Sequence, residues 1–229
     1  MAISKGAIVD FSGAAGSAGS VTSTSFDSTG GGLLAFAVVH EGAPTSYTFT
    51  DSKSGANWVT PIEQDHTTNG DFSMAVSYCW SPNVGTAHTV TCTFGAARTF
   101  RYIGGIVLNG TFGSASILAA TTQQAQGVTD GVGPDVDAGS LVTDAAAFLM
   151  QFVGNYNGHA ISIPGTDWIA DANGVGGRSY QTRNEAGSGT FDPVCALAGT
   201  TDYVTIAVAF KETAGGAVFT PRAMLLGVG

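Results

Sequence analysis

Runs of β-branched and aromatic residues, each about the length of one strand, recur along almost the whole chain. Leu33–His40, Phe72–Trp80 and Tyr203–Lys211 are strong examples, and turn residues separate such runs. The Asn69-Gly70 pair marks a tight turn, because both residue types tolerate a positive φ. The pattern predicts antiparallel strands joined by short turns, and therefore an all-β fold.

Composition agrees with this prediction. Charged residues make up 11% of the 229 residues and hydrophobic residues 44%, and the chain has 33 glycines. Long amphipathic helices need Glu, Lys and Arg on an exposed face, and this chain has too few of them. We expect residues 1–213 to form one antiparallel two-sheet β-sandwich with a core of its own.

A faint internal repetition refines this expectation. The segments that start at Gly32, Trp58, Ser77, Thr89 and Tyr102 have similar counterparts, in the same order, at Ala145, Trp168, Ser179, Pro193 and Tyr203. A repeat without a short period indicates a duplicated layout. We expect two similar strand sets that close over one core in jelly-roll fashion, although chance similarity among generic strands is the alternative.

The last sixteen residues, 214–229, differ from the rest. A glycine-rich hinge around Gly215 leads into an apolar segment, which is costly to leave in water. This C-terminal tail is either a last strand on its own domain or an arm that docks on a neighbouring subunit. The candidate docking residues are Val218, Phe219, Pro221, Arg222, Met224, Leu225 and Leu226.

Charge and targeting signals exclude several partners. The formal net charge is −9 and no Lys/Arg cluster exists, so we expect no nucleic-acid binding. Apolar runs such as Leu33–Val39 are too short to span a bilayer, so we expect no membrane contact. The sequence from Met1 to Lys5 lacks the apolar run of a secretion signal, so we expect synthesis in a host cytoplasm without a signal peptide.

The three cysteines do not resemble a disulfide framework. Cys79 and Cys92 lie on consecutive predicted strands, but alternation places Cys79 opposite the face of Met74 and Tyr78, whereas Cys92 shares the apolar face of its strand. We expect buried free thiols, and a disulfide made possible by a bulge is the alternative.

The residue pattern predicts no catalytic residue, no metal and no cofactor. In the pairs His40-Glu41 and Asp65-His66 the two side chains point to opposite faces of a strand, and His88 and His159 stand alone. The turn with Asp130, Asp135 and Asp137 lacks the ligand order of a calcium loop, so a solvated turn is expected. Nothing selects a glycosidase pair from the carboxylates Asp51, Glu63, Asp65, Asp71 and Glu185.

Aromatic side chains offer a different function, because exposed rings on one face bind sugars. The candidate glycan contacts are Tyr156, in an Asn/Gly loop, and Trp168. Packing in the core or in a loop is the alternative for both.

The chain resembles a β-sandwich domain of bacteriophage virion proteins and bacterial surface proteins. Five segments carry the resemblance: Leu33–Val39, Thr50-Asp51-Ser52 with Gly55-Ala-Asn57-Trp58, Tyr78–Trp80, His88–Phe94 and Ile206–Lys211. It implies a jelly-roll or lectin-like sandwich used for display, attachment or particle decoration.

We therefore expect a non-enzymatic structural virion protein of a bacteriophage. It would be a homo-oligomer that decorates or cements the capsid, or forms a head, neck or tail appendage, by contact with major capsid, neck or tail proteins. The alternative is an adhesin or receptor-binding module that recognises a host-surface glycan. A fold does not carry its function with it, so this expectation rests on the resemblance.

Overall fold

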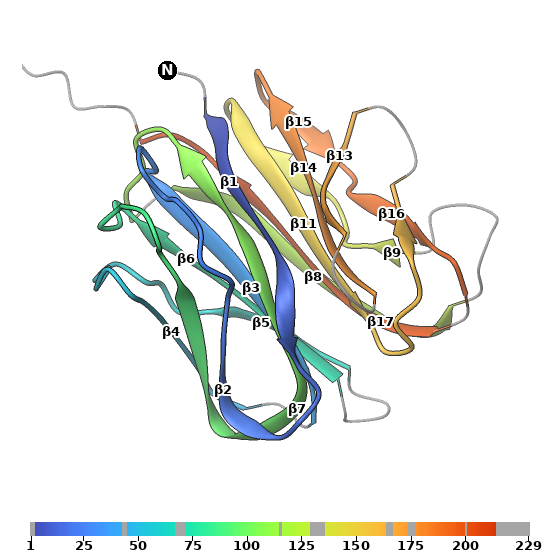
Figure 1. Ribbon diagram of the computed structural model, residues 1–229. Helices are drawn as coiled ribbons and strands as arrows, with labels where there is room; N and C mark the ends of the chain where they lie inside the picture. Colours follow the sequence, from blue (N-terminus) through green and yellow to red (C-terminus); the bar gives the residue numbers. More distant parts are fainter. Residues whose placement is uncertain are drawn as a thin grey trace, which may run out of the picture.

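The computed structural model (Figure 1) describes residues 3–42, 45–66, 72–114, 116–128, 136–163, 167–173, 177–199 and 201–213. All regular structure within these ranges is strand. The first half contains β1 (Ser4–Ala14), β2 (Ala18–Thr22), β3 (Leu33–Glu41), β4 (Tyr47–Asp51), β5 (Ile62–Asp65), β6 (Phe72–Trp80) and β7 (Val90–Asn109).

The second half contains ten strands: β8 (Ile117–Val128), β9 (Val136–Asp137), β10 (Leu141–Thr143), β11 (Ala147–Asn155), β12 (Ile161–Ser162), β13 (Ile169–Asn173), β14 (Arg178–Glu185), β15 (Gly189–Phe191), β16 (Val194–Leu197) and β17 (Thr201–Phe210). All strand pairs are antiparallel, so the predicted all-β sandwich is confirmed.

The two halves have the same strand order. The first half forms the sheet β1-β7-β3-β6-β5, and the second forms β8-β17-β11-β14-β13. In each sheet the first strand (β1 or β8) lies beside the last strand (β7 or β17). The strand at the centre is β3 in the first half and β11 in the second. A smaller outer layer repeats as well, because β2 and β4 pair with the start of β7 as β9 and β12 pair with β16.

Apolar clusters lie on both faces of each large sheet. The central cluster lies between the two large sheets and includes Ala35, Ala37, Phe148 and Phe152. A second cluster, including Leu34 and Phe36, lies between the first large sheet and its outer layer, and smaller clusters lie under the outer strands of the second half. The continuous apolar runs of β3 and β11 follow from this burial on both faces.

The sequence predicted one core between two sheets, and the structure adds an outer layer on either side. The reason in the first half is the length of β7. Its residues 90–94 pair with β4 in the outer layer, and its residues 102–108 pair with β3 in the large sheet. One long strand therefore belongs to two layers.

The halves, drawn blue to green and yellow to red in Figure 1, pack against each other, with β1 against β13 and β5 against β8. Lys5 on β1 pairs with Asp171 on β13 at 2.6 Å, and the rings of Tyr78 on β6 and Phe210 on β17 lie 5.3 Å apart. The Tyr180 hydroxyl donates to the Gly105 carbonyl at 2.6 Å. Such contacts join the two halves across the central cluster.

Candidate functional site

A buried array of hydrogen bonds joins three loops at one end of the first half. Ser28 Oγ lies 2.7 Å from His88 Nδ1, and His88 Nε2 lies 3.1 Å from Asp51 Oδ1. The side chains of His88 and Asp51 are fully buried, as is Ser28. The prediction that His88 stands alone is wrong, because its partners come from loops distant in sequence.

Asp51 is the hub of this array. Its carboxylate accepts hydrogen bonds from the Lys53 amide at 2.8 Å, the Gly55 amide at 3.0 Å and the Trp58 indole at 2.9 Å. Burial pushes the pKa of Asp51 upward, but these hydrogen bonds and that of His88 outweigh burial and lower the pKa. The ionised carboxylate of Asp51 accepts its hydrogen bond from His88 Nε2–H.

This array explains the motif with Thr50-Asp51-Ser52 and Gly55-Ala-Asn57-Trp58. The Asp51 carboxylate at the end of β4 accepts from two backbone amides of the turn, and Trp58 donates to it with its indole N–H. Asp51 and Trp58 therefore have a structural role in the motif.

Three loop residues near the array have backbone conformations that favour glycine. Ser54, Ser81 and Ala87 have φ values of 60°, 47° and 52°. Asn83 also donates to the Lys53 carbonyl at 2.9 Å, and the Gly85 amide donates to Ser28 Oγ at 3.0 Å. Strained residues persist where their surroundings over-determine them, so the array holds these loops in one rigid arrangement.

The chemistry open to this array follows from its orientation and burial. In hydrolytic Ser–His–Asp triads the serine bonds to Nε2 and the carboxylate to Nδ1, and here the two nitrogens are exchanged. Ser28 Oγ also has the Gly85 amide and carbonyl as partners, and the residue is 0% exposed. In this arrangement the array connects loops and presents no nucleophile to solvent.

The two candidate glycan contacts lie at opposite ends of β11. Tyr156 follows the end of β11, is 47% exposed and packs edge-on against Phe72, with ring centroids 6.3 Å apart. Trp168 is only 8% exposed and packs with Ala147 and Leu149, near the start of β11. The structure does not bring them together, and Tyr156 alone of the pair offers an exposed ring.

The candidate carboxylates are dispersed. Glu63 and Asp65 share one face of β5, where burial and the neighbouring Asp65 charge raise the pKa of Glu63. Glu185 is far along the chain at the end of β14 and accepts a hydrogen bond from Arg183. Among the residues that the structure describes, no group of three or more His, Cys, Asp or Glu side chains is placed to hold a metal ion.

Cys79, Cys92 and Cys195 are free and buried. Cys79 and Cys92 belong to the same apolar cluster, since both faces of β6 are covered. Burial raises the pKa of Cys79 to about 11 and raises that of Cys92 further still. The expected buried free thiols are confirmed.

Two open sheet edges lie side by side on the flank of the molecule. Among the described strands β1 pairs only with β7 and β13 only with β14, and the Lys5–Asp171 ion pair joins these two edges. Each edge carries an exposed isoleucine: Ile8 is 44% exposed and Ile169 is 53% exposed. We call β1 and β13 with Ile8 and Ile169 the paired edge.

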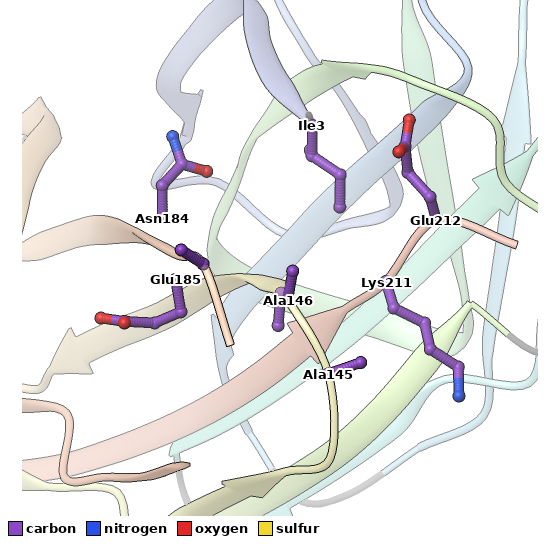
Figure 2. A pocket seen from close by; sticks show the side chains of 9 residues that line it. Ile3, Ala145, Ala146, Asn184, Glu185, Lys211 and Glu212 are labelled. Carbon is purple, nitrogen blue, oxygen red and sulfur yellow. The ribbon is translucent and has the colours of Figure 1, made fainter. Parts of the chain in front are cut away.

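A pocket of about 640 Å³ opens at one end of the sandwich, between the start of β11 and the ends of β14 and β17. Its wall is mainly apolar and includes Ile3 and four alanines. Figure 2 shows Ile3 and Ala146 facing each other across it, while the charged ends of Glu185 and Lys211 point away from its centre. The alanines are Ala145, Ala146, Ala147 and Ala186.

Several predicted residues lie outside the described part of the chain. These are Asp71, Asp130 and Asp135, and the seven docking candidates Val218, Phe219, Pro221, Arg222, Met224, Leu225 and Leu226. Asp137 is described, and its carboxylate accepts a hydrogen bond from the Gly139 amide at 2.7 Å.

Comparisons with known proteins add no relative. No protein-family model, no curated protein and no solved structure matches this chain. In the described part of the chain no helix has the length and apolar character needed to cross a membrane. The proposed function therefore rests on the fold, on the sites above and on the resemblance noted in the sequence.

Proposed function

We propose that this chain is a non-enzymatic structural protein of a bacteriophage particle, which associates with copies of itself through the paired edge. The observation that supports this proposal is the juxtaposition of two strands, β1 and β13, whose outer edges pair with no described strand and carry exposed isoleucines. An open edge presents a row of unpaired N–H and C=O groups, which another strand can pair with. Self-association would pair these groups with those of a second copy and would bring the exposed side chains of Ile8 and Ile169 into the contact.

The resemblance to virion sandwich domains favours decoration or cementing of a capsid, or a head, neck or tail appendage. The rigid double sandwich, with three layers of apolar side chains between four layers of strands, suits a particle component that must resist deformation. Major capsid, neck or tail proteins are the further partners in this proposal.

The test compares Ile8→Asp and Ile169→Asp with the matched control Val84→Asp. Val84 is 41% exposed but lies in the loop after β6, away from the paired edge. We expect the two edge variants to weaken self-association at least about tenfold, because each buries a charge in the contact, and to lower recovery in purified particles. Equal association of all four proteins would contradict the proposal, as would a wild-type protein that stays monomeric and absent from particles.

The second candidate is a glycan-binding adhesin or receptor-binding module, and the exposed ring of Tyr156 favours it. Sugar rings stack on such aromatic faces. A glycan array with the wild type and Tyr156→Ala tests it, and binding that the substitution abolishes would support it. Arrays that are blank for both proteins would exclude this candidate.

A further inference from the structure

After β17 the described part of the chain runs along the wall of the pocket of about 640 Å³. Lys211 and Glu212 line the pocket directly after β17. The Lys211 amide donates to the Ser116 carbonyl at 2.7 Å, and the Thr213 amide donates to the Thr111 carbonyl at 3.0 Å. Residues 214–229 therefore start beside the pocket.

The corresponding place in the first half is filled by the chain that follows β7. Leu108 of β7 pairs with Leu33 at the start of β3, and the chain then turns at Gly110, where φ is +148°. Phe112 is 4% exposed in the central cluster, and a Cβ on Gly32 would lie 3.0 Å from its ring. An aromatic side chain from the segment after β7 thus closes this end of the first half.

The second half repeats the strands but leaves the space open. Phe210 of β17 pairs with Phe148 at the start of β11, as Leu108 pairs with Leu33. Beyond that pair the residues of the second half that lie before β11 and after β14 have small side chains, Ala145, Ala146 and Ala186, and Ile3 lines the pocket with them. A volume of about 640 Å³ remains where the first half holds Phe112.

We propose that residues 214–229 of the same chain fill this pocket, with Val218 and Phe219 in the role that Phe112 has in the first half. Phe219 is the sixth residue after Thr213, a reach of at most about 20 Å, and Gly215 and Gly216 permit a sharp turn. The segment is as apolar as the pocket, since Pro221, Met224, Leu225 and Leu226 follow. The occupant is the chain's own segment because that segment starts at the pocket wall.

Disulfide trapping tests this assignment. The double variant Ala146→Cys/Phe219→Cys places one thiol in the pocket and one on the segment, and a bond forms only if the two Cα atoms approach within about 7 Å. The control is Ser114→Cys/Phe219→Cys, because Ser114 is exposed and follows Gly113, which lies against Thr213. The three native cysteines are buried and compete little.

We expect rapid oxidation of the pocket pair to a monomer of raised mobility on a non-reducing gel, at least about tenfold faster than the control pair. A disulfide-linked dimer would overturn the proposal, because it would place the segment on a neighbouring subunit. Equal oxidation of both pairs would overturn it as well, because the segment would then have no preference for the pocket.

Thermal unfolding gives an independent readout. Phe219→Asp should lower Tm by at least about 4 °C and Phe219→Leu by clearly less, because only aspartate is excluded from an apolar pocket. Unchanged Tm values for both variants would overturn the proposal.

Discussion

Acidification should destabilise this protein through one buried histidine. His40 is fully buried, its Nδ1 lies 3.1 Å from the Glu41 carbonyl, and its Nε2 lies 2.9 Å from the Tyr47 hydroxyl. A neutral ring satisfies both contacts, since Nδ1–H donates to the carbonyl and Nε2 accepts from the hydroxyl. Burial lowers the pKa of His40 from 6.5 to about 4, the hydrogen bond to Glu41 opposes this, and Arg98 adds to the lowering.

The sign and size of the effect follow from this pKa. Between about pH 6.5 and 4 the unfolded chain binds a proton at His40 that the folded chain does not, so stability falls as pH falls through this window. From pH 7.5 to 4.5 the loss from His40 is about 2.5 kcal/mol, which corresponds to a Tm lower by about 5 to 10 °C.

The assay is urea unfolding of the wild type and His40→Gln at both pH values. The other three histidines are present in both proteins, so their titration cancels in the comparison. We expect His40→Gln to be less stable at pH 7.5 but to lose about 2.5 kcal/mol less than the wild type on acidification. Equal losses in the two proteins would refute the reasoning.

Three further predictions concern the buried polar groups. Asp51→Asn should lower the free energy of unfolding in urea by about 2 to 4 kcal/mol, because an amide nitrogen would face N–H donors. Ser28→Ala should lower it by about 1 kcal/mol. Similar losses in the two variants would argue against Asp51 as the hub of the array. Tyr180→Phe should cost about 1 to 2 kcal/mol, because the Gly105 carbonyl loses its donor between the halves, and an unchanged midpoint would count against that contact. Cys92 should react with a thiol reagent only after denaturant is added, and fast labelling of the native protein would contradict its burial.

The strands of the large sheets were predictable because their signal is local. Phe72, Met74, Val76 and Tyr78 lie in the central cluster as their alternation requires. The segment around Arg98 and Phe100 lacks a strongly apolar pattern, yet it belongs to β7 because this strand passes from one layer to the other. The local residue pattern identifies the strands, but it does not show to which layer each strand belongs.

The candidate sites were less predictable, because they depend on contacts between distant residues. Ser28 and Asp51 meet His88 across 60 and 37 positions, and no spacing rule joins them. Ile8 and Ile169 are exposed because the register of β1 shifts and because both strands lie at sheet edges, and the local residue pattern reveals neither cause. The segment Thr50-Asp51-Ser52 is the sequence signal nearest to the array, and it entered the sequence analysis only as part of the resemblance.

The central proposal is association through the paired edge, and amide hydrogen exchange tests it most directly. In dilute protein the edge amides of β1 and β13 that pair with no described strand should exchange freely. In the concentrated or particle-bound protein we predict that protection appears on Ser4–Ala14 and Ile169–Asn173. Protection that appears instead at β5 and β8, on the opposite flank, or exchange that is the same in both states, would contradict the proposal.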